Sequence, residues 1–440
     1  MRIRDAGSPL AVVLPLVTAG MLLSVSPAWA DLNYGIEAGV GYSDNIARVD
    51  VDETDETIGT LGVNLRWLEN TRRLNADATV DLSYFEYLDN TFDSEVLGTA
   101  NGLIVLGILP ERFTWLFQDS FGQAQSDPFA PSTPETRENL NYFTTGPTLN
   151  FNFGSNTSLR LTGRYSATTY ERSPLDAERT SVGAALARQL SASSEVAFNV
   201  VEEGIDFDAP ASTDYDRRNA FLSYQLDGAR TDITAEAGYT WLERDEPGSE
   251  DTGGSLLNLS VIREISASSN LHLSLGTQLT DAGESLRGSL ESGAVGGADI
   301  TASPDPFENR SVSLAWNFSR NRTDFSLGAS WNEDRYEEQT QFDRTRLSYE
   351  ATFTRRLSPN LDFGLLATMG DEDFDTAGLD SEEVTMGANL TWRVGRTIGF
   401  RLTVDRYDRN TSNGTGEYVE NRYFLTVFLR PQRSGAAPDL

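Results

Sequence analysis

Residues 360–369 read NLDFGLLATM and residues 384–394 read VTMGANLTWRV. In both segments apolar and polar side chains alternate, so an extended chain presents one apolar face and one polar face. Strands of about 9–11 residues with this pattern cross a bilayer in β-barrels, with the apolar face toward lipid. The two segments therefore predict an antiparallel hairpin of membrane-spanning strands, with Leu365 on the lipid face and Asp362 facing the lumen.

The same unit of two alternating strands and a tight turn repeats from Asp31 to Arg430. About ten such hairpins predict an all-β, antiparallel, up-and-down transmembrane barrel of about 20 strands, with 18 as the alternative. Barrels of 16–18 strands already leave an aqueous channel, so we expect a wet lumen. Alternation begins at Tyr34, so no plug domain is expected before the barrel. The tight turns fall near Asn70, Pro110, Asn156, Ala192, Ala229, Ala267, Asn321, Pro359 and Gly395.

The start of the chain has a different pattern. Two arginines precede an apolar stretch from Leu10 to Val25, and Ala28–Ala30 forms a small-x-small cleavage site. This pattern predicts a secretory signal peptide over residues 1–30. A retained membrane anchor is the alternative, although the apolar stretch is shorter than the roughly 20 residues of a spanning helix. We expect the barrel to occupy residues 31–430 and a polar periplasmic tail to follow over residues 431–440.

Charge is unevenly distributed along the chain. The formal net charge is −31, cysteine is absent, and every basic residue is arginine. The excess of acid argues against binding of nucleic acid, and the lack of cysteine excludes disulfide and thiol chemistry. Acidic residues gather in residues 50–56, 243–251 and 371–383, which we predict to be outer connections, whereas arginines flank the tight turns, which we predict to face the periplasm. The acidic connections form either a solvated rim or sites for divalent cations beside lipopolysaccharide.

Charges of both signs fall on lumen-facing positions of the predicted strands. Arginines and carboxylates that face each other across a wet wall form a polar ladder. Such a ladder binds sugar hydroxyls or simply solvates the wall, and the sequence leaves both interpretations open. The candidate lumen-lining residues are Arg66, Asp77, Asp81, Arg160, Arg164, Arg344, Arg346, Asp362, Arg401 and Arg422.

The sequence lacks catalytic patterns. The single histidine, His272, is expected to be a plain polar residue of the lumen wall, and neither a Gly-x-Ser-x-Gly motif nor a zinc-ligand spacing occurs. Residues 371–382 place acidic side chains with the spacing of a calcium-binding loop. However, Thr376 stands where an EF-hand loop needs glycine, and the segments on both sides read as strands. We therefore expect no enzyme activity, no cofactor and no metal site. The remaining calcium candidates are Asp371, Asp373, Asp375 and Glu382.

Two further segments bear on the pore. Residues 283–306 form the longest connection, and their glycine and serine content favours flexibility. We expect this segment either to fold inward and narrow the lumen or to form a disordered outer loop. Residues 419–430 form the last strand, whose alternating aromatic pattern is similar to the terminal insertion signal of outer-membrane barrels.

The opening strand carries a family resemblance. Residues 34–48 read YGIEAGVGYSDNIAR, a glycine-rich strand that runs into an aromatic-x-Asp-Asn element at Tyr42, Asp44 and Asn45. This opening resembles that of the putative β-barrel porin 2 family. The resemblance implies an outer-membrane conduit associated with export of exopolysaccharide or capsule. A diffusion porin for small solutes is one alternative, and a surface adhesin or structural barrel is another.

We accordingly expect the protein in the outer membrane of a Gram-negative bacterium. The expected partners are outer-membrane lipid and lipopolysaccharide, the barrel assembly machinery and periplasmic components of polysaccharide export. No nucleic acid is expected among them.

Overall fold

The computed structural model describes residues 31–209, 213–245, 252–292 and 300–430. The predicted signal peptide, residues 1–30, and the predicted tail, residues 431–440, lie outside the described residues. The domain boundaries therefore stay predictions.

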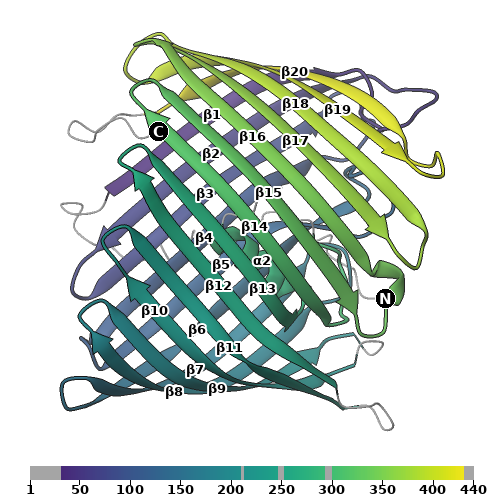
Figure 1. Cartoon of the computed structure of the whole chain (residues 1–440). Helices are drawn as coiled ribbons and strands as arrows, with labels where there is room; N and C mark the ends of the chain where they lie inside the picture. The colour runs from purple at the N-terminus through teal and green to yellow at the C-terminus, as the bar shows by residue number, and fades with distance from the viewer. Residues whose placement is uncertain (1–30, 210–212, 246–251, 293–299, 431–440) are drawn as a thin grey trace, which may run out of the picture.

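The described chain forms twenty antiparallel strands in one sheet, and each strand pairs with its neighbours in chain order. β1 also pairs with β20, which closes the sheet into a barrel (Figure 1). The expected architecture is confirmed, with 20 strands rather than 18. The strands are β1 (Asp31–Ser43), β2 (Glu56–Asn70), β3 (Leu74–Tyr87), β4 (Glu95–Leu109), β5 (Phe113–Gln125), β6 (Arg137–Phe153), β7 (Thr157–Tyr170), β8 (Ala177–Ser191), β9 (Ser194–Phe207), β10 (Tyr215–Asp227), β11 (Thr231–Arg244), β12 (Thr252–Ser266), β13 (Ser269–Thr280), β14 (Phe307–Arg320), β15 (Thr323–Tyr336), β16 (Arg344–Ser358), β17 (Leu361–Phe374), β18 (Leu379–Arg393), β19 (Ile398–Thr411) and β20 (Tyr418–Leu429).

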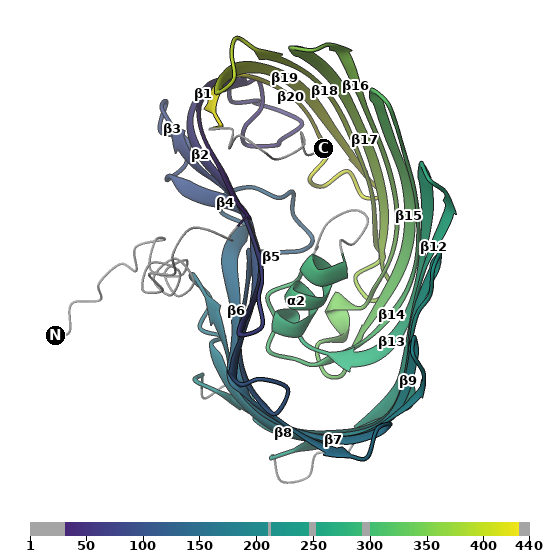
Figure 2. The ribbon, with the colours of Figure 1, turned by 90° about the vertical axis from the view of Figure 1, so that its left-hand side faces the viewer.

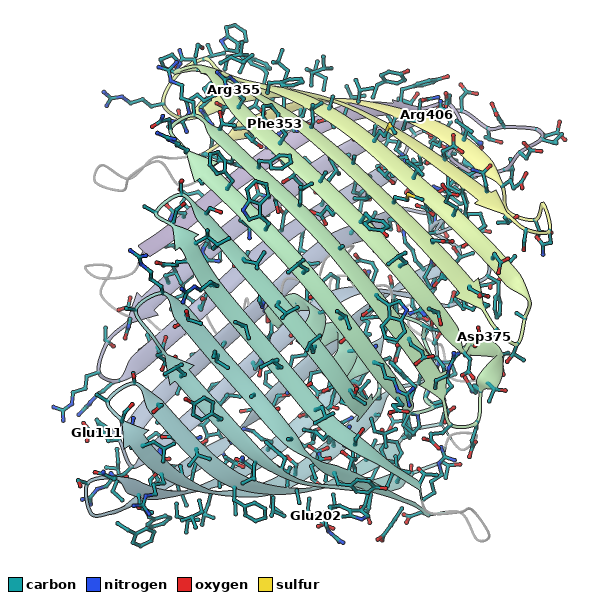
Figure 3. The ribbon with its side chains drawn as sticks, in the orientation of Figure 1. Glu111, Glu202, Phe353, Arg355, Asp375 and Arg406 are labelled. Carbon is teal, nitrogen blue, oxygen red and sulfur yellow. The ribbon has the colours of Figure 1, made fainter. Side chains whose placement is uncertain are left out.

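The strand register separates the two faces of the wall. In β17 and β18, Phe363 lies opposite Leu390 and Leu365 lies opposite Ala388, so these side chains share one face. Leu365 is 44% exposed and Leu390 is 40% exposed. Apolar side chains such as Phe353 project from the outside of the wall (Figure 3). Exposed apolar rows of this kind fit a barrel whose outer surface meets lipid.

Tight turns join each even-numbered strand to the following odd-numbered strand, so all nine lie at one end of the barrel. The connections at the other end are longer, with one exception. We expected residues 371–383 to form an acidic loop, and this expectation is wrong. β17 and β18 continue outward until Phe374 pairs with Leu379, and only residues 375–378 connect them. Phe374 is fully buried because Phe129 packs on it at 4.9 Å between ring centroids, which stabilises the extended strand ends.

The barrel is flattened in cross-section and contains a helix, α2 (Ala282–Ser292), inside its lumen (Figure 2). A short 3₁₀ helix, η2 (Thr340–Phe342), follows β15. In the described parts of the chain, no helix has the length and apolarity needed to cross a membrane.

α2 belongs to the connection between β13 and β14, residues 281–306, and contacts β4, β5 and β6. The described part of this connection is folded inward rather than forming an outer loop. The expected absence of a plug domain stays a prediction.

Candidate functional site in the barrel lumen

The predicted polar wall begins near the tight-turn end of β2 and β3. Arg66 Nη1 donates a hydrogen bond of 2.7 Å to Thr79 Oγ1, and Arg66 lies 3.5 Å from Asp77. Asp81 accepts a 2.9 Å hydrogen bond from Asn64 Nδ2. These groups share the face opposite Leu61 and Val63, which are exposed on the outer surface.

Other candidates pair with charges or carbonyls on neighbouring strands. Arg160 lies 3.8 Å from Glu195, and Arg401 lies 3.4 Å from Glu37 across the closing strands. Asp362 contacts Arg393 at 2.5 Å and Arg356 at 3.7 Å. Arg164 instead donates to the carbonyl of Pro147 at 2.6 Å.

The last candidates lie toward the long-connection end. Arg344 pairs with Asp334 and Glu372, both at 3.0 Å, and Arg346 lies two residues farther along β16. Arg422 contacts Glu420 at 2.5 Å. The predicted candidates thus stand on many strands as a ladder of local pairs, and the structure does not bring them together at one point. Their role in lining a conducting path stays a prediction.

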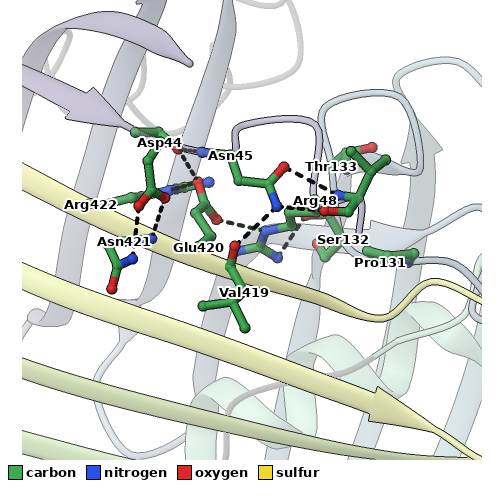
Figure 4. Close-up of polar contacts among 12 residues, drawn as sticks. Asp44, Asn45, Arg48, Pro131, Ser132, Thr133, Val419, Glu420, Asn421 and Arg422 are labelled. Carbon is green, nitrogen blue, oxygen red and sulfur yellow. Dashed lines mark hydrogen bonds and ion pairs between the residues drawn. The ribbon is translucent and has the colours of Figure 1, made fainter. Parts of the chain in front are cut away.

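Sequence reasoning did not identify the polar network at the barrel seam, where β1 meets β20. Glu420 is fully buried and accepts hydrogen bonds from Ser43 Oγ at 2.6 Å and from Arg48 Nε at 2.9 Å. Asn45 Nδ2 donates to the carbonyls of Val49 and Val419. Figure 4 shows this network, which includes the Asp-Asn element of the opening strand.

Connection 281–306 is attached to the wall by apolar packing and by backbone pairing. Ala282 and Leu286 on one side of α2 pack in a buried cluster with Leu140 and Tyr170 of the wall. Farther along, Gln125 N donates to the carbonyl of Ile300 at 2.7 Å, and Ala302 N donates to the carbonyl of Gln125 at 2.8 Å. The described residues on both sides of 293–299 are therefore held against β5 and β6.

Ion pairs attach the same connection to strands β8 and β10 of the wall. Arg179 pairs with Asp281, with Glu284 at 2.9 Å and with Glu203 at 3.4 Å. Arg217 pairs with Glu203 at 2.5 Å and with Glu284 at 2.7 Å. We call these five residues the anchor cluster.

The arginines of the anchor cluster stabilise the ionised form of Glu284. Burial acts to raise the pKa of Glu284, but Arg217, Arg179 and Arg287 outweigh it and lower the pKa to about 2. Glu284 therefore remains charged near neutral pH and holds α2 to two arginines of the wall. Because charge-assisted bonds depend on both charges, acid is expected to weaken this attachment.

A second inward segment, residues 126–136, connects β5 to β6 and reaches the far wall. Phe129 packs on Phe374 and on Phe342, and its carbonyl accepts a 3.2 Å hydrogen bond from Arg409 Nη2. Arg48 Nη1 donates to the carbonyl of Ser132 at 2.9 Å. This segment therefore bridges strands on two sides of the lumen.

A cavity of about 320 Å³, which we call the chamber, lies between segment 126–136 and the wall formed by β16 to β19. Pro128, Ala130 and Ile300 contribute to its inner side, while Glu383 and Arg409 contribute to the wall side. Of the candidate lumen-lining residues named above, Arg346 is the one that lines it.

Sequence reasoning missed Arg179, Arg217 and Arg409, although each occupies an inward position of an alternating strand. Alternation could have identified them as lumen-facing. Their partners could not be found in this way, because Asp281 and Glu284 come from an irregular connection and the Phe129 carbonyl comes from another.

The remaining predicted sites make few contacts. His272 Nε2 hydrogen-bonds with Ser260 at 3.1 Å and with Ser274 at 3.2 Å, in an ordinary polar environment. Asp371 and Asp373 lie on β17, opposite Glu382 and Asp380 of β18. Asp375 pairs with Arg335 at 2.6 Å. No group of three metal-ligating side chains is close enough to hold an ion among the described residues.

Comparison with known protein families supports the predicted resemblance. Residues 268–431 match the family model described as Putative beta-barrel porin 2. The predicted family resemblance is confirmed. The match spans β13 to β20 of this porin-like barrel and does not include the opening motif on which the resemblance was based. Among curated proteins, none matches the sequence.

Solved structures match this chain at low sequence identity and with TM-scores below 0.5. The siderophore receptor PirA from Pseudomonas aeruginosa is 10% identical, with a TM-score of 0.43 over 91% of this chain and 80% of that chain. The ferric citrate transporter FecA is 12% identical and has a TM-score of 0.45. The match covers 91% of this chain and 79% of that chain. The structure of OccK2 (OpdF) from Pseudomonas aeruginosa in complex with glucuronate is 11% identical and has a TM-score of 0.38. The match covers 91% of this chain and 99% of that chain. The match to the porin family model and the barrel fold support an outer-membrane location.

Proposed function

We propose that this chain is a gated outer-membrane pore that conducts carbohydrate, with exopolysaccharide as its principal cargo. The observation that carries the proposal is the described part of connection 281–306, residues 281–292 and 300–306, which lies inside a 20-stranded barrel and is held there by the anchor cluster. A barrel of this size is wide enough for an aqueous channel. The segment that obstructs the lumen is attached to the wall by non-covalent contacts, so it can be displaced without breaking a covalent bond.

The wall chemistry supports a carbohydrate cargo. Arg66, Asp77, Arg401 and Glu37 place donors and acceptors at successive positions along the wall. Sugar hydroxyls both donate and accept hydrogen bonds, so a wall with charges of both signs provides exchangeable partners along the path.

In this proposal the barrel lies in the outer membrane of a Gram-negative bacterium, beside lipopolysaccharide, after insertion by the barrel assembly machinery. A periplasmic component of polysaccharide export displaces connection 281–306 and opens the path. Exposed acidic side chains of the long connection 44–55 form part of the solvated outer rim.

A channel for small polar solutes is the second candidate, and the chamber favours it. Its volume of about 320 Å³ is at the lower end of the range of about 300–1,000 Å³ for small-molecule sites. A polymer conduit needs the inward segments to move, whereas a small-solute channel needs only a path past them.

A clean deletion strain separates the candidates. If the barrel exports polymer, cells lacking it lose surface polysaccharide or retain polymer in the periplasm, with normal uptake of small sugars. Reduced uptake with normal surface polymer supports the small-solute channel instead. Normal results in both assays would rule out both transport functions and leave the adhesin or structural barrel.

A further inference from the structure

Arg409 differs from the other buried arginines of the described chain. Five arginines are buried, namely Arg48, Arg179, Arg217, Arg344 and Arg409. The first four each contact at least one carboxylate. Arg409 is 4% exposed and has no carboxylate within ion-pair distance in the described parts of the chain. A buried charge without a counter-charge is costly, so an unpaired guanidinium suggests an absent anion.

The hydrogen-bond partners of Arg409 are also incomplete. Nη2 donates to the carbonyl of Phe129 at 3.2 Å, whereas Nη1 is buried and has no acceptor among the described residues. Tyr418 lies opposite Arg409 on β20, and its buried hydroxyl likewise has no hydrogen-bond partner there. Two neighbouring buried donors therefore lack an acceptor.

The chamber places Arg409 beside groups that suit a sugar. Glu383 lies opposite Arg409 on β18, and both line the chamber, as do the hydroxyl residues Ser348, Ser381 and Thr385. Glu383 makes no ion pair with Arg409 within 4.0 Å among the described residues, Arg137 is paired with Glu95, and Glu372 is paired with Arg344, so no chamber carboxylate forms an ion pair with Arg409. Carboxylates and hydroxyls suit sugar hydroxyl groups, and they disfavour a ligand with more than one negative charge.

We propose that the chamber is a binding site for a monocarboxylated sugar, with Arg409 as the residue that binds its carboxylate. Ser348, Ser381 and Glu383 hydrogen-bond the sugar hydroxyls. The size of the chamber selects a single sugar residue rather than a longer stretch of polymer. This inference deepens the proposed function, on which it rests, by assigning an acidic sugar as the recognised unit.

Calorimetric titration of the purified full chain in detergent micelles tests the site. The probes are galacturonate, galactose and inorganic phosphate. Galactose is the matched neutral probe, because it carries a CH₂OH group where galacturonate carries a carboxylate. We expect galacturonate to bind at least about tenfold more tightly than galactose, because a buried site that binds a polar group of its ligand discriminates against an analogue lacking that group. Phosphate should bind no more tightly than galactose.

Variants assign the effect to Arg409. Arg409→Gln should remove the preference for galacturonate, and Arg409→Lys should retain part of it, because lysine keeps the charge without the planar donor fork. Arg218→Gln removes a charge from a different ion pair, that of Arg218 with Glu202, and should change nothing. Heat-modifiable migration in gels verifies that each variant is folded.

Equal binding of galacturonate and galactose by the wild-type chain would overturn the proposal, whether or not any variant folds. An unchanged preference in Arg409→Gln would overturn the assignment to Arg409. Phosphate binding as tight as that of galacturonate would indicate a general anion site and would overturn the proposed specificity for a sugar acid. The measurement in micelles is independent of export, so a failure of the deletion experiment and a failure of this site are separately recognisable.

Discussion

Asp44 and Asn421 are joined by two hydrogen bonds, of 2.7 Å from the Asn421 backbone N–H and 2.8 Å from its side-chain amide, although they lie near opposite ends of the barrel sequence. Asp44 belongs to the Asp-Asn element after β1, and Asn421 belongs to β20. Beside them, the buried Arg48–Glu420 ion pair bridges the same seam at 2.9 Å. The motif that carries the family resemblance therefore stabilises the closure of the barrel.

The seam contacts predict a stability effect. Asp44→Ala removes both acceptors for Asn421 and should destabilise the barrel by about 1–3 kcal/mol, the range for groups left without a partner. The temperature at which the heat-modifiable form disappears should fall. Asp50→Ala, an exposed carboxylate in the same connection, is the matched control. Equal temperatures for the two variants would show that Asp44 does not stabilise the seam.

The lipid face can be tested with adjacent residues of β17. Leu365→Arg places a charge on the outer surface and should cost roughly 2–4 kcal/mol near the bilayer midplane. Leu366→Arg places the same charge on the lumen side, opposite Gly387, and should be tolerated far better. Chemical unfolding of the barrel from lipid vesicles measures both. A larger loss for Leu366→Arg would reverse the assignment of the two faces.

The anchor cluster predicts a gating phenotype. Glu203→Gln removes the carboxylate shared by Arg179 and Arg217 and should raise single-channel conductance by loosening connection 281–306. Glu202→Gln is the control, because Glu202 pairs with Arg218 and both side chains are nearly half exposed. If the two variants conduct alike in planar bilayers, the anchor cluster does not hold the obstruction.

The low pKa of Glu284 predicts a response to acid. Its pKa of about 2 lies below the ordinary value of 4.5, so its contribution to the attachment is complete above about pH 4.5 and is lost as the pH falls toward 2. Conductance should therefore rise as the pH falls from about 4.5 toward 2 in the wild-type chain. Glu284→Gln should be more conductive at pH 7 and should respond less to acid. An identical acid response in this variant would exclude Glu284 as the titrating group.

The direction of insertion gives a topological prediction. A protease site inserted at Gly414, in the connection between β19 and β20, should be cleaved in intact cells, because the longer connections of such barrels face outward. The same site at Asn321, in a tight turn, should be cleaved only after the outer membrane is permeabilised. Cleavage at Asn321 in intact cells would reverse the orientation.

Alternation alone determined the strands, the tight turns and the two faces of the wall, because each depends only on neighbouring residues in the chain. Leu365 and Asp362 could be assigned to opposite faces without coordinates, and so could Glu202 and Glu203. The same reasoning failed at residues 371–383, where the packing of Phe129 on Phe374 extends the strands beyond the length predicted from alternation. That contact joins residues far apart in the sequence, so no local pattern contains it.

The tertiary structure decided what occupies the lumen. The glycine and serine content of residues 283–306 was compatible with an inward fold or an outer loop. The pairing of Glu284 with Arg179 and Arg217 and the packing of Leu286 on the wall show that the described part folds inward. Likewise, alternation places Arg409 on the lumen side, but the lack of an acceptor for its Nη1 among the described residues is seen only once the surrounding strands are closed into a barrel. Strand faces follow from the two-residue period of an extended chain, whereas charge pairing inside the barrel depends on which distant segments the closed sheet brings together.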